Sequence, residues 1–235
     1  MNYDESALQI VREDRLLINR YDDWLFDEFK PYVGRRILEV GCGLGNLLIH
    51  FTDRELVVGI EPSDDVVRQV RDRFAQYPNI VVMSLGITDS QVLELADKQL
   101  DTVISLNVFE HIEDDILALK NTFHLLRPGG KLILIVPAHQ QLYGQIDRSI
   151  GHYRRYTKTS MKFTVEQAGF TILTQKYINI LGALGWWVNS RLLQRHVPPS
   201  GQLRLFNSLV PALRWFEKII PTPFGISLLT VALKP

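Results

Sequence analysis

The chain has 235 residues, of which 46% are hydrophobic and 22% charged, and these proportions exclude a disordered or collagen-like protein. Lysine and arginine number 26, as do aspartate and glutamate, so no overall positive field attracts nucleic acid. The only cysteine, Cys42, excludes an intramolecular disulfide and a cysteine-rich zinc site. Because the sequence shows neither a signal-peptide segment nor a run of about 18 apolar residues, we expect a soluble, cytoplasmic protein.

From residue 35 to about residue 177, short apolar segments alternate with amphipathic segments of helical period. The apolar segments are rich in β-branched residues and leucine, which favours strands covered on both faces, and they lie at 36–40, 56–60, 80–83, 102–106 and 131–136. The amphipathic segments predict helices at 44–51, 64–76, 114–126 and 160–168, preceded by one or two helices within 6–30. This alternation predicts an α/β fold with a doubly wound, mostly parallel sheet.

The pattern changes after Gly169. Residues 170–177 and 226–233 predict two further strands, and the 48 residues between them exceed what a hairpin needs. We therefore expect a helical lead-in at 1–34 and a main domain at 35–235, with a helical insert at about 178–225.

The predicted insert is rich in tryptophan and in positive charge. It contains three of the four tryptophans. Its charged residues are five arginines and lysines and a single acid, Glu217. Two segments fit helices with apolar and basic sides, which suit a membrane surface or a lipid-bearing acceptor. Tryptophan and arginine are equally typical of protein interfaces, so a cap over the active site and a homodimer contact are the alternatives.

A glycine-rich turn follows the first predicted strand. Its glycines, Gly41, Gly43 and Gly45, alternate with other residues, and glycine permits both left-handed backbone and close approach of a ligand. An ordinary tight turn would use glycine as well. The surrounding acids add information, because Glu39 lies in the first strand and Glu61 ends the second.

This arrangement resembles motif one of class I S-adenosylmethionine-dependent methyltransferases, and segments 101–112 and 126–134 resemble two later motifs in the same order. The resemblance implies a Rossmann-like seven-stranded sheet with an antiparallel last strand, and S-adenosylmethionine as cofactor. It gives Glu39 a role in ordering the turn, and Glu61 a role in accepting both ribose hydroxyls. The predicted cofactor-binding residues are Glu39, Gly41, Cys42, Gly43, Gly45, Asn46, Glu61, Pro62, Ser63, Gly86 and Asn107.

Two departures from related patterns bear on this prediction. A nicotinamide-dependent oxidoreductase is the rival, but it needs G-x-G-x-x-G and Asn46 interrupts that spacing. Many of the methyltransferases also place an acid after the third strand to bind adenine, whereas this chain has Leu-Gly-Ile-Thr-Asp at 85–89. Either Asp89 or the backbone would make that contact.

Histidines near the predicted carboxyl edge of the sheet are candidate bases, because imidazole titrates near neutrality. His111 follows the fourth strand, although a structural role at a helix start is an equal alternative. His139 and His152 lie in a polar segment at 137–156, which is either an acceptor-binding loop or a solvated basic loop. The predicted substrate-binding residues are Tyr143, Asp147, Arg154, Arg155 and Tyr156.

No metal site is predicted. The stretch before His111 resembles one in ubiquinone-pathway O-methyltransferases in which acids and histidine can hold a divalent metal, but Asn107 stands in place of the first acid. Segments 142–157, 179–187 and 211–227 resemble a bacterial subgroup often found beside glycosyltransferases. That resemblance favours transfer to a hydroxyl of a small-molecule, sugar or lipid-linked glycan acceptor. N- or C-methylation of a metabolite, RNA or protein methylation, and a non-catalytic cofactor-binding protein are the alternatives.

Overall fold

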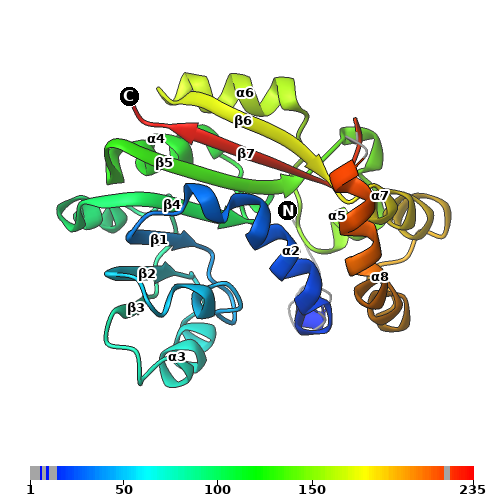
Figure 1. The fold of residues 1–235 in the computed structure, drawn as a ribbon, viewed down its shortest axis with the longest axis horizontal. Helices are drawn as coiled ribbons and strands as arrows, with labels where there is room; N and C mark the ends of the chain where they lie inside the picture. Colours follow the sequence, from blue (N-terminus) through cyan, green and yellow to red (C-terminus); the bar gives the residue numbers. More distant parts are fainter. Residues whose placement is uncertain (1–5, 7–8, 11–14, 220–222) are drawn as a thin grey trace.

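The computed structural model describes residues 6, 9, 10, 15–219 and 223–235. Seven strands form one sheet in the order β3-β2-β1-β4-β5-β7-β6 (Figure 1). The strands are β1 Arg36–Val40, β2 Leu56–Ile60, β3 Ile80–Met83, β4 Leu100–Leu106, β5 Leu126–Pro137, β6 Thr171–Ile178 and β7 Ser227–Leu233. The last strand, β7, pairs antiparallel with β5 and β6, and the other pairs are parallel. The predicted doubly wound sheet is confirmed.

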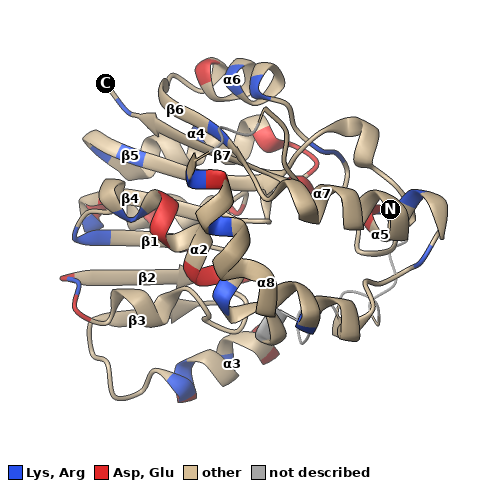
Figure 2. Ribbon diagram, turned by 45° about the vertical axis from the view of Figure 1, so that its right-hand side comes forward, with Lys and Arg blue, Asp and Glu red and all other residues tan. Residues whose placement is uncertain are grey.

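Helices cover both faces of the sheet. The α-helices are α2 Asn19–Phe29, α3 Asp64–Arg73, α4 Asp115–Leu125, α5 Gln145–Ser149, α6 Lys158–Gln167, α7 Ile180–Trp187 and α8 Ser200–Ile219. Short 3-10 helices lie at η1 Arg15–Ile18, η2 Lys30–Tyr32, η3 Leu48–Phe51, η4 Ser90–Lys98, η5 Phe109–His111 and η6 Gln140–Leu142, and a π-helical turn lies at η7 Val188–Leu192. Figure 2 shows positions of both charge signs on α3 and on α6.

Alternate residues of each strand point to opposite faces of the sheet, and each face buries its own hydrophobic cluster. In β1, Leu38 and Val40 belong to one cluster and Ile37 to the other. Helices α4 and α6 contribute to the first cluster, and α2 and α3 to the second. Because helices cover both faces, a ligand can reach the sheet at the end where the carboxyl termini of the parallel strands lie.

The segment 44–51 does not form the predicted helix. Residues 44–47 are turns, and only the single 3-10 turn η3 follows them. Gly45 has a φ of +76°, which interrupts a right-handed helix. A Cβ atom at Gly45 would lie 2.6 Å from Cε2 of Phe74, so the turn is packed tightly against the end of α3.

The lead-in belongs to the core of the molecule. Trp24, Leu25 and Phe29 of α2 are at most 1% exposed and share a hydrophobic cluster with Ile37 and Val57 of the sheet. Part of the predicted helical segment 6–30 lies outside the described residues. The boundary at residue 34 stays a prediction about domains.

Between β6 and β7 the chain forms α7, η7 and α8. Glu217 of α8 is 5% exposed, and its carboxylate accepts hydrogen bonds from the backbone N–H groups of Asn179 (3.1 Å) and Ile180 (2.8 Å). This carboxylate therefore caps α7 and ties the two insert helices together. Among the described residues, no helix is both long and apolar enough to span a bilayer.

Candidate active site

A cavity of about 1510 Å³ opens at the carboxyl ends of β1, β2 and β4. The strand order reverses between β1 and β4, and ligands of open α/β sheets bind at such a switch point. The walls include the glycine turn, the residues after β2, β3 and β4, the start of α2, part of the segment 146–155, and the insert. Ligand pockets usually measure about 300 to 1,000 Å³, so this cavity has room for a cofactor beside an acceptor.

The glycine turn forms one wall. Gly41, Gly43 and Gly45 all have positive φ, at +71°, +49° and +76°, which is the conformation for which glycine is preferred. A Cβ atom at Gly41 would lie 2.4 Å from Cγ2 of Val108, whereas one at Gly43 would meet no protein atom within 4 Å. Gly43 therefore presents bare backbone to the cavity, where a ligand can approach it closely.

Two buried acids flank this turn. Glu39 and Glu61 are each 4% exposed and both line the cavity. The Glu61 carboxylate accepts long hydrogen bonds from the backbone N–H groups of Gly43 (3.3 Å) and Ser63 (3.4 Å). Since a carboxylate can accept about four hydrogen bonds, Glu61 can hold the turn and also receive a diol. Burial and the charge of Glu39 raise the pKa of the Cys42 thiol, which keeps that side chain protonated.

The turns after β3 and β4 complete the half of the cavity nearest the glycine turn. Leu85, Gly86 and Ile87 line it, but Asp89 does not. The Asp89 carboxylate instead accepts a 2.7 Å hydrogen bond from the N–H of Gly86. Of the two predicted adenine contacts, this placement favours the backbone. Asn107 lines the cavity with a φ of +54°, a conformation that asparagine tolerates well.

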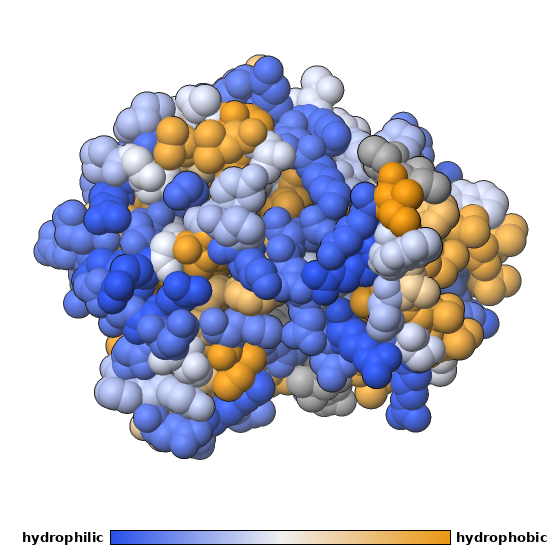
Figure 3. Space-filling model, in the orientation of Figure 1, coloured by the Kyte–Doolittle hydropathy of each residue, from blue (hydrophilic) through white to orange (hydrophobic). Residues whose placement is uncertain are grey.

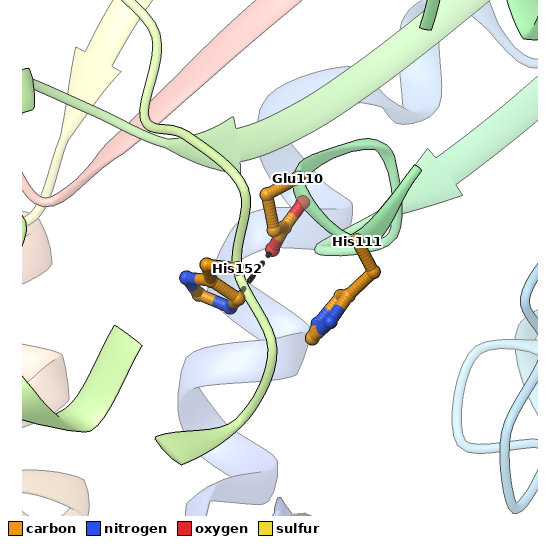
Figure 4. Close-up of side chains that lie close together, drawn as sticks. All are labelled: Glu110, His111 and His152. Carbon is orange, nitrogen blue, oxygen red and sulfur yellow. Dashed lines mark ion pairs between the residues drawn. The ribbon is translucent and has the colours of Figure 1, made fainter. Parts of the chain in front are cut away.

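On the opposite side, Glu110, His111 and His152 converge (Figure 4). Glu110 and His111 come from η5 after β4, and His152 comes from the loop after α5. Nε2 of His152 lies 3.7 Å from Oε1 of Glu110, and the two histidine rings are perpendicular with centroids 4.6 Å apart. Each of the three offers one ligand atom within 4.8 Å of the others, so these are the residues that could hold a metal ion.

Behind His152, the buried carboxylate of Asp147 joins four donors. Oδ1 lies 2.8 Å from Nδ1 of His152 and accepts from Nε of Arg155 at 2.7 Å. Oδ2 accepts from the N–H of Gly144 at 2.9 Å and from Nε1 of Trp186 at 3.1 Å. Since Trp186 belongs to α7, Asp147 joins the histidine loop to the insert.

These contacts fix the protonation of His152. Burial alone would raise the pKa of Asp147, but the hydrogen bond from His152 and the charge of Arg155 lower it overall, so Asp147 is a carboxylate and Nδ1 of His152 carries a hydrogen. Burial lowers the pKa of His152, although Asp147 partly opposes this. The imidazole is therefore neutral near pH 7, with Nε2 free of a proton on the side of Glu110 and the cavity.

The chain matches known proteins in sequence and in fold. Residues 14–175 match the profile of the family described as Methyltransferase domain. The chain belongs to the class I S-adenosylmethionine-dependent methyltransferases. A methyltransferase of Mycobacterium bovis is 29% identical over 133 residues, which cover 56% of this chain and 51% of that protein. The tRNA U34 carboxymethyltransferase of Alteromonas mediterranea is 32% identical over 127 residues, 48% of this chain and 36% of that protein. The chain thus spans about half the length of the curated mycobacterial relative.

Solved structures show the same fold. A SAM-dependent methyltransferase from Archaeoglobus fulgidus superposes with a TM-score of 0.61 at 19% identity, over 92% of this chain and 94% of that one. The [4+2]-cyclase SpnF superposes with a TM-score of 0.58 at 16% identity, over 94% and 80%. S-adenosylmethionine is the cofactor of the methyltransferase family, and the cavity fits it: bare backbone at Gly43 and the carboxylate of Glu61 face one space.

Most of the predicted cofactor-binding residues lie around one cavity. All of them except Gly45 line the cavity, and Gly45 packs against Phe74 instead. Of the predicted bases, His111 and His152 line the cavity, but His139 does not. The His139 ring stacks on Phe224 with centroids 4.0 Å apart. A base role for His139 therefore has no support from its position.

Among the predicted substrate-binding residues of the methyltransferase, Arg155 alone lines the cavity. The others hold the loop in place. Tyr143 donates a 2.7 Å hydrogen bond to the carbonyl of His152, Arg154 forms a 2.9 Å ion pair with Asp115, and Tyr156 donates to that same Asp115 carboxylate at 2.8 Å. These three side chains, like Asp147, act on the position of the loop.

Glu110 and Trp186 are among the cavity residues that the predicted site did not include. Glu110 is fully buried, and its position next to His111 in the chain was the available signal. Trp186 is bonded to Asp147 across 39 residues of chain, and no local pattern indicates that contact.

Proposed function

We propose that this methyltransferase transfers the methyl group of S-adenosylmethionine to a hydroxyl oxygen of a small-molecule, sugar or lipid-linked glycan acceptor. The observation that carries the proposal is the buried His152 in the cavity wall, oriented by Asp147 at 2.8 Å. When bound, the sulfonium supplies an electrophilic methyl group. A hydroxyl must lose its proton as the new C–O bond forms, and an oriented imidazole is a suitable acceptor for that proton.

The charges around His152 support this role. The hydrogen bond and the charge of Asp147 raise the pKa of His152, against burial and the charge of Arg155, which lower it. Oε1 of Glu110 lies 3.7 Å from Nε2 of His152. Asp147 therefore partly offsets the cost of forming a buried imidazolium when the acceptor loses its proton, as in other acid–histidine pairs.

The lining of the acceptor side supports an acceptor with polar and apolar parts. Arg155 lines the polar part of the wall, where its guanidinium is paired with Asp147 at 2.7 Å. Leu181, Leu184 and Leu205 of the insert line the outer part of the same cavity. A sugar carried on a lipid combines both chemistries. We also propose a cytoplasmic location, which is compatible with a single unpaired cysteine.

The test is to incubate the full chain with S-adenosylmethionine and a panel of sugars, nucleotide sugars, lipid-linked sugars and small alcohols, and to detect methylated products by mass. The position of the methyl group, read by NMR, is expected on oxygen. His152→Gln should lower the rate by about 10² to 10⁴ without changing cofactor affinity. His124→Gln, an exposed histidine on α4, is the matched control.

Methylation on nitrogen or carbon would replace the hydroxyl proposal with the alternative acceptor chemistry. Normal turnover in His152→Gln would remove this residue from the reaction. Cofactor binding without turnover on any acceptor would favour a non-catalytic protein, an outcome that fold similarity alone does not exclude.

A further inference from the structure

The insert exposes an unusually apolar surface. Large hydrophobic side chains project from α7, η7 and α8, and the most exposed are Leu184 (59%), Leu192 (64%), Leu205 (62%), Trp215 (67%) and Ile219 (58%). We call this surface the insert face. In Figure 3 hydrophobic residues gather on the right-hand side, where Figure 1 places α7 and α8. Contiguous apolar patches on soluble proteins mark interaction sites.

Helix α8 has two apolar sides. Phe206, Val210 and Leu213 pack into the hydrophobic cluster that also contains α2. Leu205, Leu209, Phe216 and Ile219 recur at helical spacing on another side and stay exposed by 42% to 62%. Since the first side already packs the helix against the core, folding does not need the second side. The second side is therefore available to contact a binding partner.

The charge of the insert is one-sided. Arg191, Arg204 and Lys218 are exposed, while the single acid, Glu217, is buried under α7 as the cap of that helix. Helices α3 and α6, by contrast, carry both signs. The insert face therefore presents apolar side chains among cations, with no exposed acid between 179 and 219 in the described part of the chain.

The insert face is continuous with the cavity. Leu181, Leu184, Leu205 and Leu209 line the cavity and are also 39% to 62% exposed, so they form an apolar rim at its mouth. An acceptor that enters the cavity over this rim passes from the apolar insert face to the apolar lining of the cavity.

We propose that the insert face docks onto an anionic lipid bilayer, with the mouth of the cavity against the lipid, so that a lipid-borne acceptor enters from the membrane. The part concerning the acceptor rests on the proposed function; the docking does not. A lipid surface fits better than a second copy of the chain, because two insert faces would bring like charges together, whereas anionic headgroups complement the cations.

The test is flotation of the full chain with vesicles of phosphatidylcholine, with and without phosphatidylglycerol. The wild type should float with the anionic vesicles at low salt and dissociate at about 1 M salt, where charges are screened beyond about 3 Å. Arg204→Glu with Lys218→Glu should lower the partition coefficient by at least about tenfold, and Trp215→Ser with Ile219→Ser should lower it as well. The matched controls are Lys120→Glu on α4 and Phe163→Ser on α6, where Phe163 is 63% exposed.

Absence of the wild type from the anionic vesicle layer would overturn the proposal, and so would a stable dimer in sedimentation that is dissociated by Trp215→Ser. Equal partition of the insert variants and the controls would also overturn it. S-adenosylmethionine affinity, measured by titration without lipid, separates this outcome from failure of the proposed function, because docking needs no turnover and cofactor binding needs no membrane.

Discussion

Nδ1 of His152 lies 2.8 Å from Oδ1 of Asp147, and the same oxygen accepts from Nε of Arg155 at 2.7 Å. Asp147 is therefore a positioning residue: it sets the tautomer and orientation of His152 while its second oxygen holds Trp186 of the insert at 3.1 Å. Through one buried carboxylate, the geometry of the base depends on the docking of α7.

The first prediction concerns the stability of this network. Asp147→Asn removes the only carboxylate that is hydrogen-bonded to Arg155 among the described residues, and it leaves a buried cation without a paired charge. Breaking a buried pair in this way costs about 3 to 5 kcal/mol, so the free energy of unfolding in urea should fall by that amount. Asp97→Asn, an exposed acid at the end of η4, should change it by less than about 0.5 kcal/mol. Equal stabilities for the two variants would refute the network.

The pH dependence of methyl transfer follows from His152. Protonated His152 cannot take a proton, so the rate should fall as pH falls through its pKa. Burial lowers this pKa in the folded protein, so the acid limb should lie below the ordinary histidine value of about 6.5 and the rate should be flat above it. The folded state disfavours protonation, so stability should also decline below pH 6.5. The limb should disappear in His152→Gln, and its persistence there would assign the titration to another group.

The strands and the cofactor side of the cavity could be predicted because their signals are local. Continuous β-branched runs mark the strands of a sheet covered on both faces. Gly41 and Gly43 stand between two strands, one containing Glu39 and the other followed by Glu61, and the parallel pairing of β1 with β2 brings these elements to the same edge. Chain order alone therefore places the acids and the bare backbone around one space.

The acceptor side could not be predicted because its contacts join distant parts of the chain. Arg154 is a residue type that often binds anions, yet it forms an ion pair with Asp115 at 2.9 Å. The sequence does not show which basic residues have such partners. Trp186 was predicted as part of an amphipathic helix, and its bond to Asp147 depends on how α7 packs. The prediction of a helix at 44–51 was wrong. The periodicity of the apolar residues in this segment did not reveal the tight packing of Gly45 against Phe74.

Cofactor affinity should depend on the charge of Glu61. Glu61→Gln keeps the shape of the side chain and one acceptor oxygen, but it removes the charge that strengthens hydrogen bonds from hydroxyls. A hydrogen bond to a charged group contributes about 1.5 to 3 kcal/mol, so the Kd for S-adenosylmethionine, measured by calorimetric titration, should rise by about 10- to 100-fold. Glu94→Gln, exposed on η4, is the control and should bind normally. An unchanged Kd in Glu61→Gln would mean that this acid does not hold the cofactor.

Alanine variants at three glycines with positive φ distinguish an effect on cofactor binding from an effect on stability. Gly43 (φ +49°) and Gly129 (φ +76°) both have open space where a Cβ would lie, but only Gly43 lines the cavity. Gly43→Ala and Gly129→Ala should therefore share a similar strain of about 1 to 2 kcal/mol, while only Gly43→Ala should weaken cofactor binding, by tenfold or more, because its methyl group occupies the space of the ligand. Gly41→Ala should lose more stability than either, since its Cβ would lie 2.4 Å from Val108. Melting temperatures and cofactor titrations of the three variants decide the matter: equal cofactor affinity in Gly43→Ala and Gly129→Ala would show that the bare backbone at Gly43 does not touch the cofactor.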